Sequence, residues 1–156
     1  ILASREDFDL DHQLNSDCAL LSNLVQKVLE VSSKVKLLRD PTRGGIATTL
    51  NEIADYYQLG ISLVEAKLPI LTRVHNLANI LGIDPLYFAS EGRFISIVDQ
   101  EEAEQVIEKL HQDKLGQKAV IIGEVMNRDT GVYLQTKFGG TRILRSLDQQ
   151  LLPRIC

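Results

Sequence analysis

The feature that most constrains this chain is a glycine-rich turn between a short apolar run and an amphipathic segment. Residues 35–38 (VKLL) are typical of a strand that ends before Pro41, because a proline disfavours helical backbone in the residue that precedes it. After Gly44 and Gly45, apolar residues recur every three to four positions as far as Tyr57, as on one face of a helix. The order strand, turn, helix is typical of mixed α/β folds.

The same two spacings recur along the rest of the chain. Apolar residues at helical spacing predict helices at 17–32, 46–57, 71–81 and 101–111. Short apolar or alternating runs predict strands at 35–38, 61–65, 93–98, 119–125, 132–136 and 141–144, the last two as a hairpin. We therefore expect an α/β fold: a single domain over residues 1–145 with a mixed β-sheet flanked by helices, followed by a flexible tail over 146–156.

Two of these helices carry more detailed expectations. Ser16 and Asp17 precede the first helix and are expected to cap it. In the second helix, the polar residues are expected to lie largely opposite the apolar face, namely Thr48, Asn51, Glu52 and Asp55.

Composition excludes several classes of protein. A chain of 156 residues with 44% hydrophobic and 24% charged residues has enough apolar material for one folded domain. Its net charge of -4 argues against a nucleic-acid or anionic-membrane partner, which would need clustered Lys and Arg. It has neither a run of about 20 apolar residues nor a signal-peptide pattern, so we expect a cytoplasmic protein. The chain opens on Ile1 rather than Met, which suggests a piece of a longer protein.

The glycine-rich turn is a candidate phosphate site. Backbone N–H groups at the start of a helix attract anions, glycine allows close approach, and Arg can bind phosphate through two nitrogens. The alternative is an ordinary helix entry in which the carboxylate closes the turn and the arginines are solvated. The spacing is not that of a P-loop. The candidate residues are Arg39, Asp40, Thr42, Arg43, Gly44 and Gly45.

A second candidate lies at residues 84–92, DPLYFASEG. Glu91 stands beside Gly92 just before a predicted strand, and a carboxylate held on a tight turn can act as a general base. The alternative is an acid on a surface turn. The three histidines are scattered along the sequence and receive no role.

The two cysteines, Cys18 and Cys156, are too far apart in sequence to suggest a disulfide framework or a metal site, and no metal ligands are expected. Cys18 is expected to be partly buried. Cys156 is the final residue, and its thiolate, favoured by Arg154, could carry a covalently bound group on an extended tail. An accidental terminal cysteine is the alternative.

Five stretches together resemble the HypE family of hydrogenase maturation proteins, within the aminoimidazole-ribonucleotide-synthetase-like (AIR-synthase-like) superfamily. Ser90 departs from the resemblance, since many relatives have Asn there. The terminal PRIC, which includes Pro153 and Arg154, is the most specific match. The stretches are residues 38–54, 84–92, 121–125, 138–144 and 152–156.

The resemblance implies that this chain is the C-terminal domain of a carbamoyl dehydratase. In that family a carbamoyltransferase, HypF, loads the sulfur of the terminal cysteine, here Cys156. ATP-dependent dehydration then yields a thiocyanate, and the HypC–HypD complex accepts the cyanide. Glu91 would be the base, and Arg43 in the turn would neutralise phosphate charge.

The resemblance also bears on what lies outside this chain. Residues 1–15 would be a linker from a missing N-terminal domain that supplies most ligands of ATP and Mg²⁺. The full-length protein would be a homodimer, and this piece alone would bind ATP weakly and be inactive.

Two alternative functions stay open. One is a relative of AIR synthetase or selenophosphate synthetase that acts on a free small molecule and needs no terminal thiol. The other is a carrier or docking module whose tail is modified by partner proteins, with no catalysis of its own.

Overall fold

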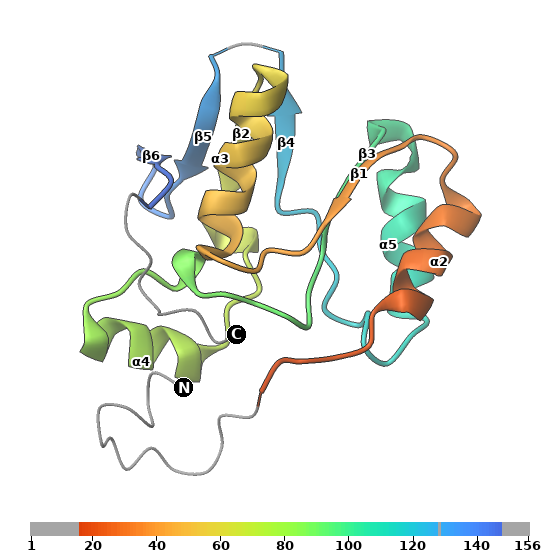
Figure 1. Ribbon diagram of the computed structural model, residues 1–156, viewed down its shortest axis with the longest axis horizontal. Helices are drawn as coiled ribbons and strands as arrows, with labels where there is room; N and C mark the ends of the chain where they lie inside the picture. Colours follow the sequence, from red (N-terminus) through yellow and green to blue (C-terminus); the bar gives the residue numbers. More distant parts are fainter. Residues whose placement is uncertain (1–15, 128, 148–156) are drawn as a thin grey trace.

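The computed structural model describes residues 16–127 and 129–147, which form helices on two small β-sheets (Figure 1). The helices are α2 (Ser22–Val31), α3 (Gly45–Tyr57), α4 (Thr72–Leu81) and α5 (Ala103–His111), with short 3-10 turns at η1 (Glu65–Lys67), η2 (Pro85–Tyr87) and η3 (Gln100–Glu102). The strands are β1 (Val35–Arg39), β2 (Gly60–Val64), β3 (Ile95–Val98), β4 (Gly123–Met126), β5 (Gly131–Gln135) and β6 (Thr141–Leu144).

The larger sheet has the strand order β4-β2-β5-β6. Strand β2 runs parallel to β5, whereas β4 and β6 pair antiparallel with their neighbours. Helix α3 lies along one face of this sheet (Figure 1). Its apolar side and the inward residues of the strands form the main core, in which the larger buried residues are Leu50, Ile53, Ile61, Leu63, Leu86, Val132, Leu134 and Leu144.

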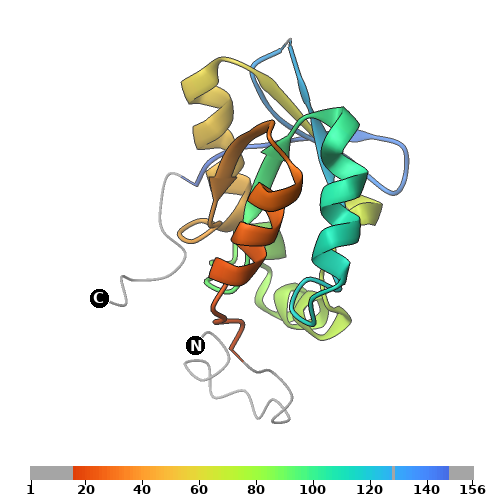
Figure 2. The same cartoon turned by 90° about the vertical axis from the view of Figure 1, so that its right-hand side faces the viewer.

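The smaller sheet is an antiparallel pair, β1 and β3. Helices α2 and α5 lie side by side against it (Figure 2). Between these elements is a second core whose buried residues are Leu24, Val28, Val106 and Leu110.

The β1–β3 pair contributes to both cores, because a bulge changes the face that β1 presents. Val35 lies opposite Val98 and packs in the second core, whereas Leu37 lies opposite Ile97 and packs against the main core. Residues two apart in a regular strand share one face, and the register shift between Val35 and Leu37 breaks that rule. One short ribbon thus joins two apolar layers.

The expectation of a mixed α/β domain with helices flanking strands is confirmed, and the larger sheet is mixed. The strands are divided between two sheets instead of forming one. The predicted strand at 119–125 is shorter and later, at Gly123–Met126, because only residues 123–126 pair with β2.

The expected cap of the first helix is wrong. Helix α2 begins at Ser22 with Leu21 at its N-cap position, and no side chain caps it. The backbone of Asp17 lies instead directly against Gly92, where a Cβ would collide with the Asp17 carbonyl oxygen. This tertiary contact holds Asp17 outside helix α2.

Two burial expectations are also wrong. Cys18 is exposed, because the segment before α2 runs over the surface. Asn51, expected on the polar face of α3, is only 8% exposed, and its side chain is satisfied by hydrogen bonds inside the protein.

Candidate functional site at the glycine-rich turn

The turn between β1 and α3 depends on its two glycines. Gly44 has φ +72° and Gly45 φ +61°, a left-handed conformation that costs other residues more. Gly44 is the N-cap of α3, and no side chain caps the helix. The N–H groups of the first helical turn are therefore not satisfied by a side-chain cap, and the positive end of the helix dipole faces the turn.

The turn packs directly on the segment 84–92. A Cβ on Gly45 would stand 2.5 Å from the carbonyl oxygen of Leu86 and 2.7 Å from that of Phe88, so only glycine fits. In the same contact, the backbone N–H of Ser90 donates to the carbonyl of Pro41 over 3.0 Å. The two segments that the sequence singled out are therefore brought together.

The arginines of the turn differ in their surroundings. The Arg39 guanidinium donates to the Glu52 carboxylate over 2.6 Å, and both side chains are half exposed. Arg43 is exposed, and no ion pair to it occurs among residues 16–127 and 129–147. Arg43 is thus the freer cation for an incoming anion.

A cavity of about 400 Å³ opens beside the turn. Its polar wall comes from the candidate residues, and its apolar wall comes from β1, from α2 and from the residue just before β3. The lining residues are Val25, Leu38, Arg39, Asp40, Thr42 and Phe94. The cavity therefore combines charged groups with an apolar surface, as small-molecule sites do.

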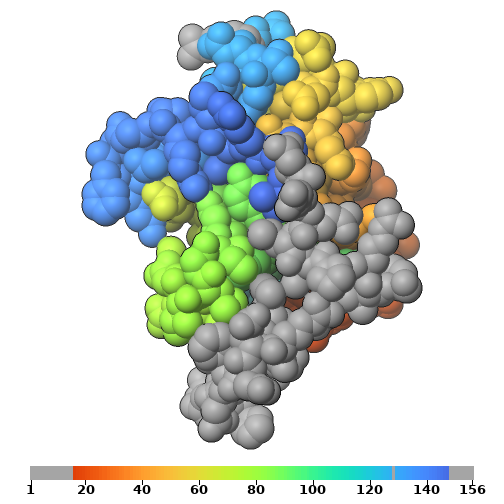
Figure 3. All heavy atoms as spheres, turned by 60° about the vertical axis from the view of Figure 1, so that its left-hand side comes forward, coloured from red at the N-terminus to blue at the C-terminus, as the bar shows by residue number. Residues whose placement is uncertain are grey.

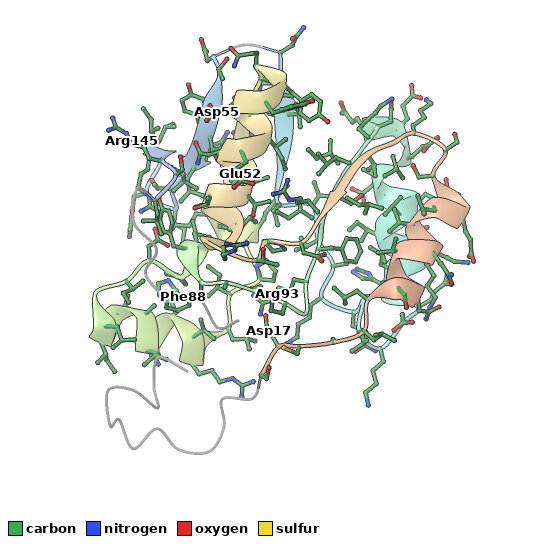
Figure 4. The ribbon with its side chains drawn as sticks, viewed as in Figure 1. Asp17, Glu52, Asp55, Phe88, Arg93 and Arg145 are labelled. Atoms are coloured by element: carbon green, nitrogen blue, oxygen red, sulfur yellow. The ribbon has the colours of Figure 1, made fainter. Side chains whose placement is uncertain are left out.

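Glu91 projects from the loop that precedes β3 and is exposed. Its neighbour Ser90 is buried, and the Ser90 hydroxyl accepts a 3.3 Å hydrogen bond from Arg93. Asp17 and Arg93 both lie below the N-terminal end of α3 (Figure 4). The close contact of Asp17 with Gly92 fixes this loop on its other side. Glu91 thus stands on a loop held in place by both of its neighbours.

Asp84, the first residue of the second segment, has a structural role. One carboxylate oxygen accepts from the Leu86 N–H over 3.0 Å and caps η2, and the other accepts from Arg142 over 2.6 Å. Helix α4 and the β5–β6 hairpin flank this position, and Figure 3 shows the hairpin in blue above α4 in green. A second cavity of about 440 Å³, which includes His75 in its lining, lies between them.

Three groups with displaced pKa values lie beside α2 and α5, away from the turn. The Glu101 carboxylate, through a hydrogen bond, and the charge of Asp99 raise the pKa of Lys34. The Ser32 hydroxyl lowers the pKa of Glu102 by donating to it. A hydrogen bond from Lys27 lowers the pKa of Asp113.

The remaining predicted site residues, Pro153, Arg154 and Cys156, lie outside the described residues. Sequence reasoning missed two residues that hold the chain at Leu144 and Arg145, the end of β6 and the residue after it. Asn51 donates to the Leu144 carbonyl, and the Tyr87 hydroxyl donates to the Arg145 carbonyl. The signal available in the sequence was an amide close to the apolar face of a predicted helix.

With this geometry in hand, comparison with known proteins identifies the family. Residues 1–135 match the family described as AIR synthase related protein, C-terminal domain. The chain belongs to this family. Over its whole length it is 43% identical to the carbamoyl dehydratase HypE of Cupriavidus necator, covering 45% of that protein, and 43% identical to that of Escherichia coli K12, covering 46%.

Solved structures agree with this assignment to the AIR synthase related family. A crystal structure of the hydrogenase maturation protein HypE has a TM-score of 0.92 at 38% identity, covering 99% of this chain and 50% of that one. HypE in complex with ATP gives 0.91 at 39% identity, over 99% and 48%. A HypE–HypF complex gives 0.88 at 36% identity, over 94% and 48%. The chain spans about half the length of its relatives.

Proposed function

We propose that the longer protein containing this chain is an ATP-dependent carbamoyl dehydratase of nickel–iron hydrogenase maturation. In this proposal residues 1–145 form its C-terminal domain, 1–15 are a linker from an ATP-binding domain, and 146–156 are a tail that presents Cys156. The substrate is the carbamoyl group on the Cys156 sulfur. The product is a thiocyanate that donates the cyanide ligand of the hydrogenase iron.

One observation carries the role of this domain: the packing of Gly45 on the carbonyl groups of Leu86 and Phe88. It brings the N-terminal end of α3, which favours anions, beside the loop that bears Glu91. A site that must stabilise phosphate and remove protons needs these two functions close together. The 43% identity, over the whole length of this chain, to proteins named carbamoyl dehydratase supports the same reaction.

The chemistry has two stages. The carbamoyl oxygen attacks the γ-phosphorus of ATP, ADP leaves, and the poor leaving oxygen becomes a phosphate ester. The nitrogen then loses its two protons as the carbon–oxygen bond breaks, which gives the nitrile and inorganic phosphate. Sulfur keeps its bond to carbon throughout, and no redox change occurs.

Each candidate residue has a defined part in this scheme. Glu91 accepts a proton from nitrogen, because it is the carboxylate on the loop held against the turn. Arg43 and the positive N-terminal end of α3, which begins after Gly44, neutralise charge that develops on the phosphate. Arg39, Asp40 and Thr42 line the adjacent cavity.

The described residues contain no cluster of three or more His, Cys, Asp or Glu side chains that could hold a metal ion. They do not by themselves fit the implied Mg²⁺, so we assign the ion no step and expect its ligands in the part of the protein outside this chain. HypF as loading partner is supported by the solved HypE–HypF complex of a relative. HypC–HypD as acceptor, a homodimer and a cytoplasmic location belong to the same proposal.

Among the described residues, no helix is long and apolar enough to cross a membrane.

The test is intact mass spectrometry of the full-length protein with carbamoyl phosphate, HypF and ATP. We expect a gain of about 43 Da on Cys156, followed by a loss of about 18 Da when the carbamoyl group is dehydrated. The Glu91→Gln variant should keep the gain and lose most of the second step. A mass gain on any other residue would contradict the proposal.

The two alternatives give different results in the same assay. An AIR-synthetase-like or selenophosphate-synthetase-like enzyme would keep its ATP-dependent activity in Cys156→Ala. A carrier module would be loaded but would hydrolyse no ATP, with or without Glu91.

A further inference from the structure

Two side chains hold the chain at the end of β6 and at the residue that follows it. Asn51 Nδ2 donates to the carbonyl of Leu144, the last residue of β6, over 3.0 Å and to the Ala47 carbonyl over 2.8 Å. A buried amide is costly unless it is hydrogen-bonded, and an apolar residue would fill this place in α3 more cheaply. The amide therefore serves to tie α3 to the end of an edge strand.

The next residue is held from another element. The Tyr87 hydroxyl, on η2, donates to the Arg145 carbonyl over 2.8 Å. Two successive carbonyls, those of Leu144 and Arg145, thus accept hydrogen bonds from side chains of other elements, and Leu144 is in addition paired with Val132 of β5. Beyond Arg145 the sequence continues for 11 residues, 146–156, to Cys156.

Both anchors stand on the elements that build the candidate site. Asn51 is six residues beyond Gly45 on α3, which corresponds to roughly 9 Å along the helix. Tyr87 lies in η2, whose carbonyls contact Gly45. The 11 residues after Arg145 would span at most roughly 36–40 Å if fully extended, so the chain is long enough to bring Cys156 back to the turn.

We propose that Asn51 and Tyr87 are positioning residues that fix the origin of the C-terminal tail beside the glycine-rich turn and so raise the effective concentration of Cys156 there. This inference rests on the proposed function. Effective concentration falls with about the 3/2 power of linker length once the linker exceeds the span. On that scaling, freeing β6 would lengthen the chain between the last fixed residue and Cys156 from 11 residues (146–156) to 20 (137–156), and the encounter would become about two- to threefold less frequent.

The test compares the reaction within one molecule with the reaction of a free peptide. Full-length Tyr87→Phe and Asn51→Ala, carbamoylated on Cys156, should dehydrate about two- to threefold more slowly in single turnover at saturating ATP. The second arm uses full-length Cys156→Ala and a free S-carbamoylated peptide of residues 148–156. There the same substitutions should leave kcat and KM unchanged, because no tail origin is involved.

Tyr133→Phe is the matched control. It also removes a tyrosine hydroxyl near a backbone carbonyl, but that carbonyl belongs to Thr130, just before β5, and not to the end of β6. It should leave both arms at the wild-type rate. Equal losses in both arms for Tyr87→Phe would indicate a merely structural role and overturn the proposal, as would no loss in the first arm.

Hydrogen exchange separates this inference from the proposed function. The amides of 141–147 should exchange faster in Tyr87→Phe and Asn51→Ala, whereas those of β4 at the other sheet edge should not change. Unchanged exchange over 141–147 would refute the anchors whatever the activity. Absence of the 18 Da loss in the wild-type protein would refute the dehydratase proposal and leave the exchange result to decide on the anchors.

Discussion

The region around α3 and the four-stranded sheet differs from the region around α2 and α5 in what holds it together. Among the described residues, the first region has ten buried apolar residues in its core and the second has four. The second region adds a polar network, in which Lys27 and Asn23 bind Asp113 and Ser32 binds Glu102.

Because of this difference, the stability of the two regions should respond differently to pH and salt. The glycine-rich turn leads into α3, whose apolar side lies in the larger core, where the free energy comes mainly from apolar burial. The α2–α5 region gains part of its stability from ion pairs and charged hydrogen bonds, which respond to pH and salt. Four substitutions probe the contrast.

The largest effect is expected for Leu63→Ala in the main core. Leu63 is 1% exposed on β2, one of the two inner strands, so its loss leaves a cavity that neighbouring strands cannot close. We expect unfolding to require about 3–5 kcal/mol less, measured by denaturant titration. Ile143→Ala, at a position 59% exposed on β6, is the control and should change stability little.

Leu24→Ala makes a similar truncation in the smaller core, where Leu24 is 4% exposed. We expect a loss of about 2–3 kcal/mol, since α2 lies at the surface and can shift inward. The measurement is the same titration. A loss larger than that of Leu63→Ala would reverse the ranking of the two cores.

Gly45→Ala tests the contact that builds the candidate site. Both a left-handed φ and a collision with two carbonyls oppose it, so we expect a loss of about 1–3 kcal/mol and a dehydration rate reduced at least tenfold. Gly82→Ala is a matched control, because Gly82 has φ +64° but nothing within 4 Å of an added Cβ. Its smaller stability loss should come without a change in rate.

The smallest effect is expected for Asp113→Asn, read as a pH dependence. The hydrogen bond from Lys27 lowers the pKa of the Asp113 carboxyl in the folded protein. Its contribution to stability is therefore complete above the unfolded pKa and is lost as the pH falls through the lower folded pKa. Thermal melts should show wild type above the variant at pH 7, with the difference shrinking below about pH 4. A difference independent of pH would contradict the assignment.

Local spacing was enough to predict most elements of this fold. The helices corresponding to α3, α4 and α5 and the strands β2, β5 and β6 lie within a few residues of the predicted ranges, because each has a regular apolar period. The start of α2 was not predictable, because the contact between Asp17 and Gly92 joins residues far apart in the sequence. The division into two sheets depends on which strands pair with one another, and the apolar period within a strand does not show this.

The candidate site was predictable as two motifs but not as one contact. Glycine at 45 suggested close approach of a ligand, whereas its missing side chain makes room for the carbonyls of Leu86 and Phe88. The pair between Arg39 and Glu52 was also hidden, since a strand and a helix carry the two charges. Asn51 was assigned to the wrong face because hydropathy alone says nothing about a bond to Leu144.

The bulge between Val35 and Leu37 has a consequence for how this domain can be divided. Residues of the β1–β3 pair pack in both cores, so neither face of this pair can be exposed to water without loss of apolar contacts. A deletion that removed α2 and α5 would expose Val35, Phe94 and Val98 to water. The remaining protein would then carry an apolar patch prone to aggregation. The two layers are therefore inseparable as modules, and any shortened version of this domain must keep both.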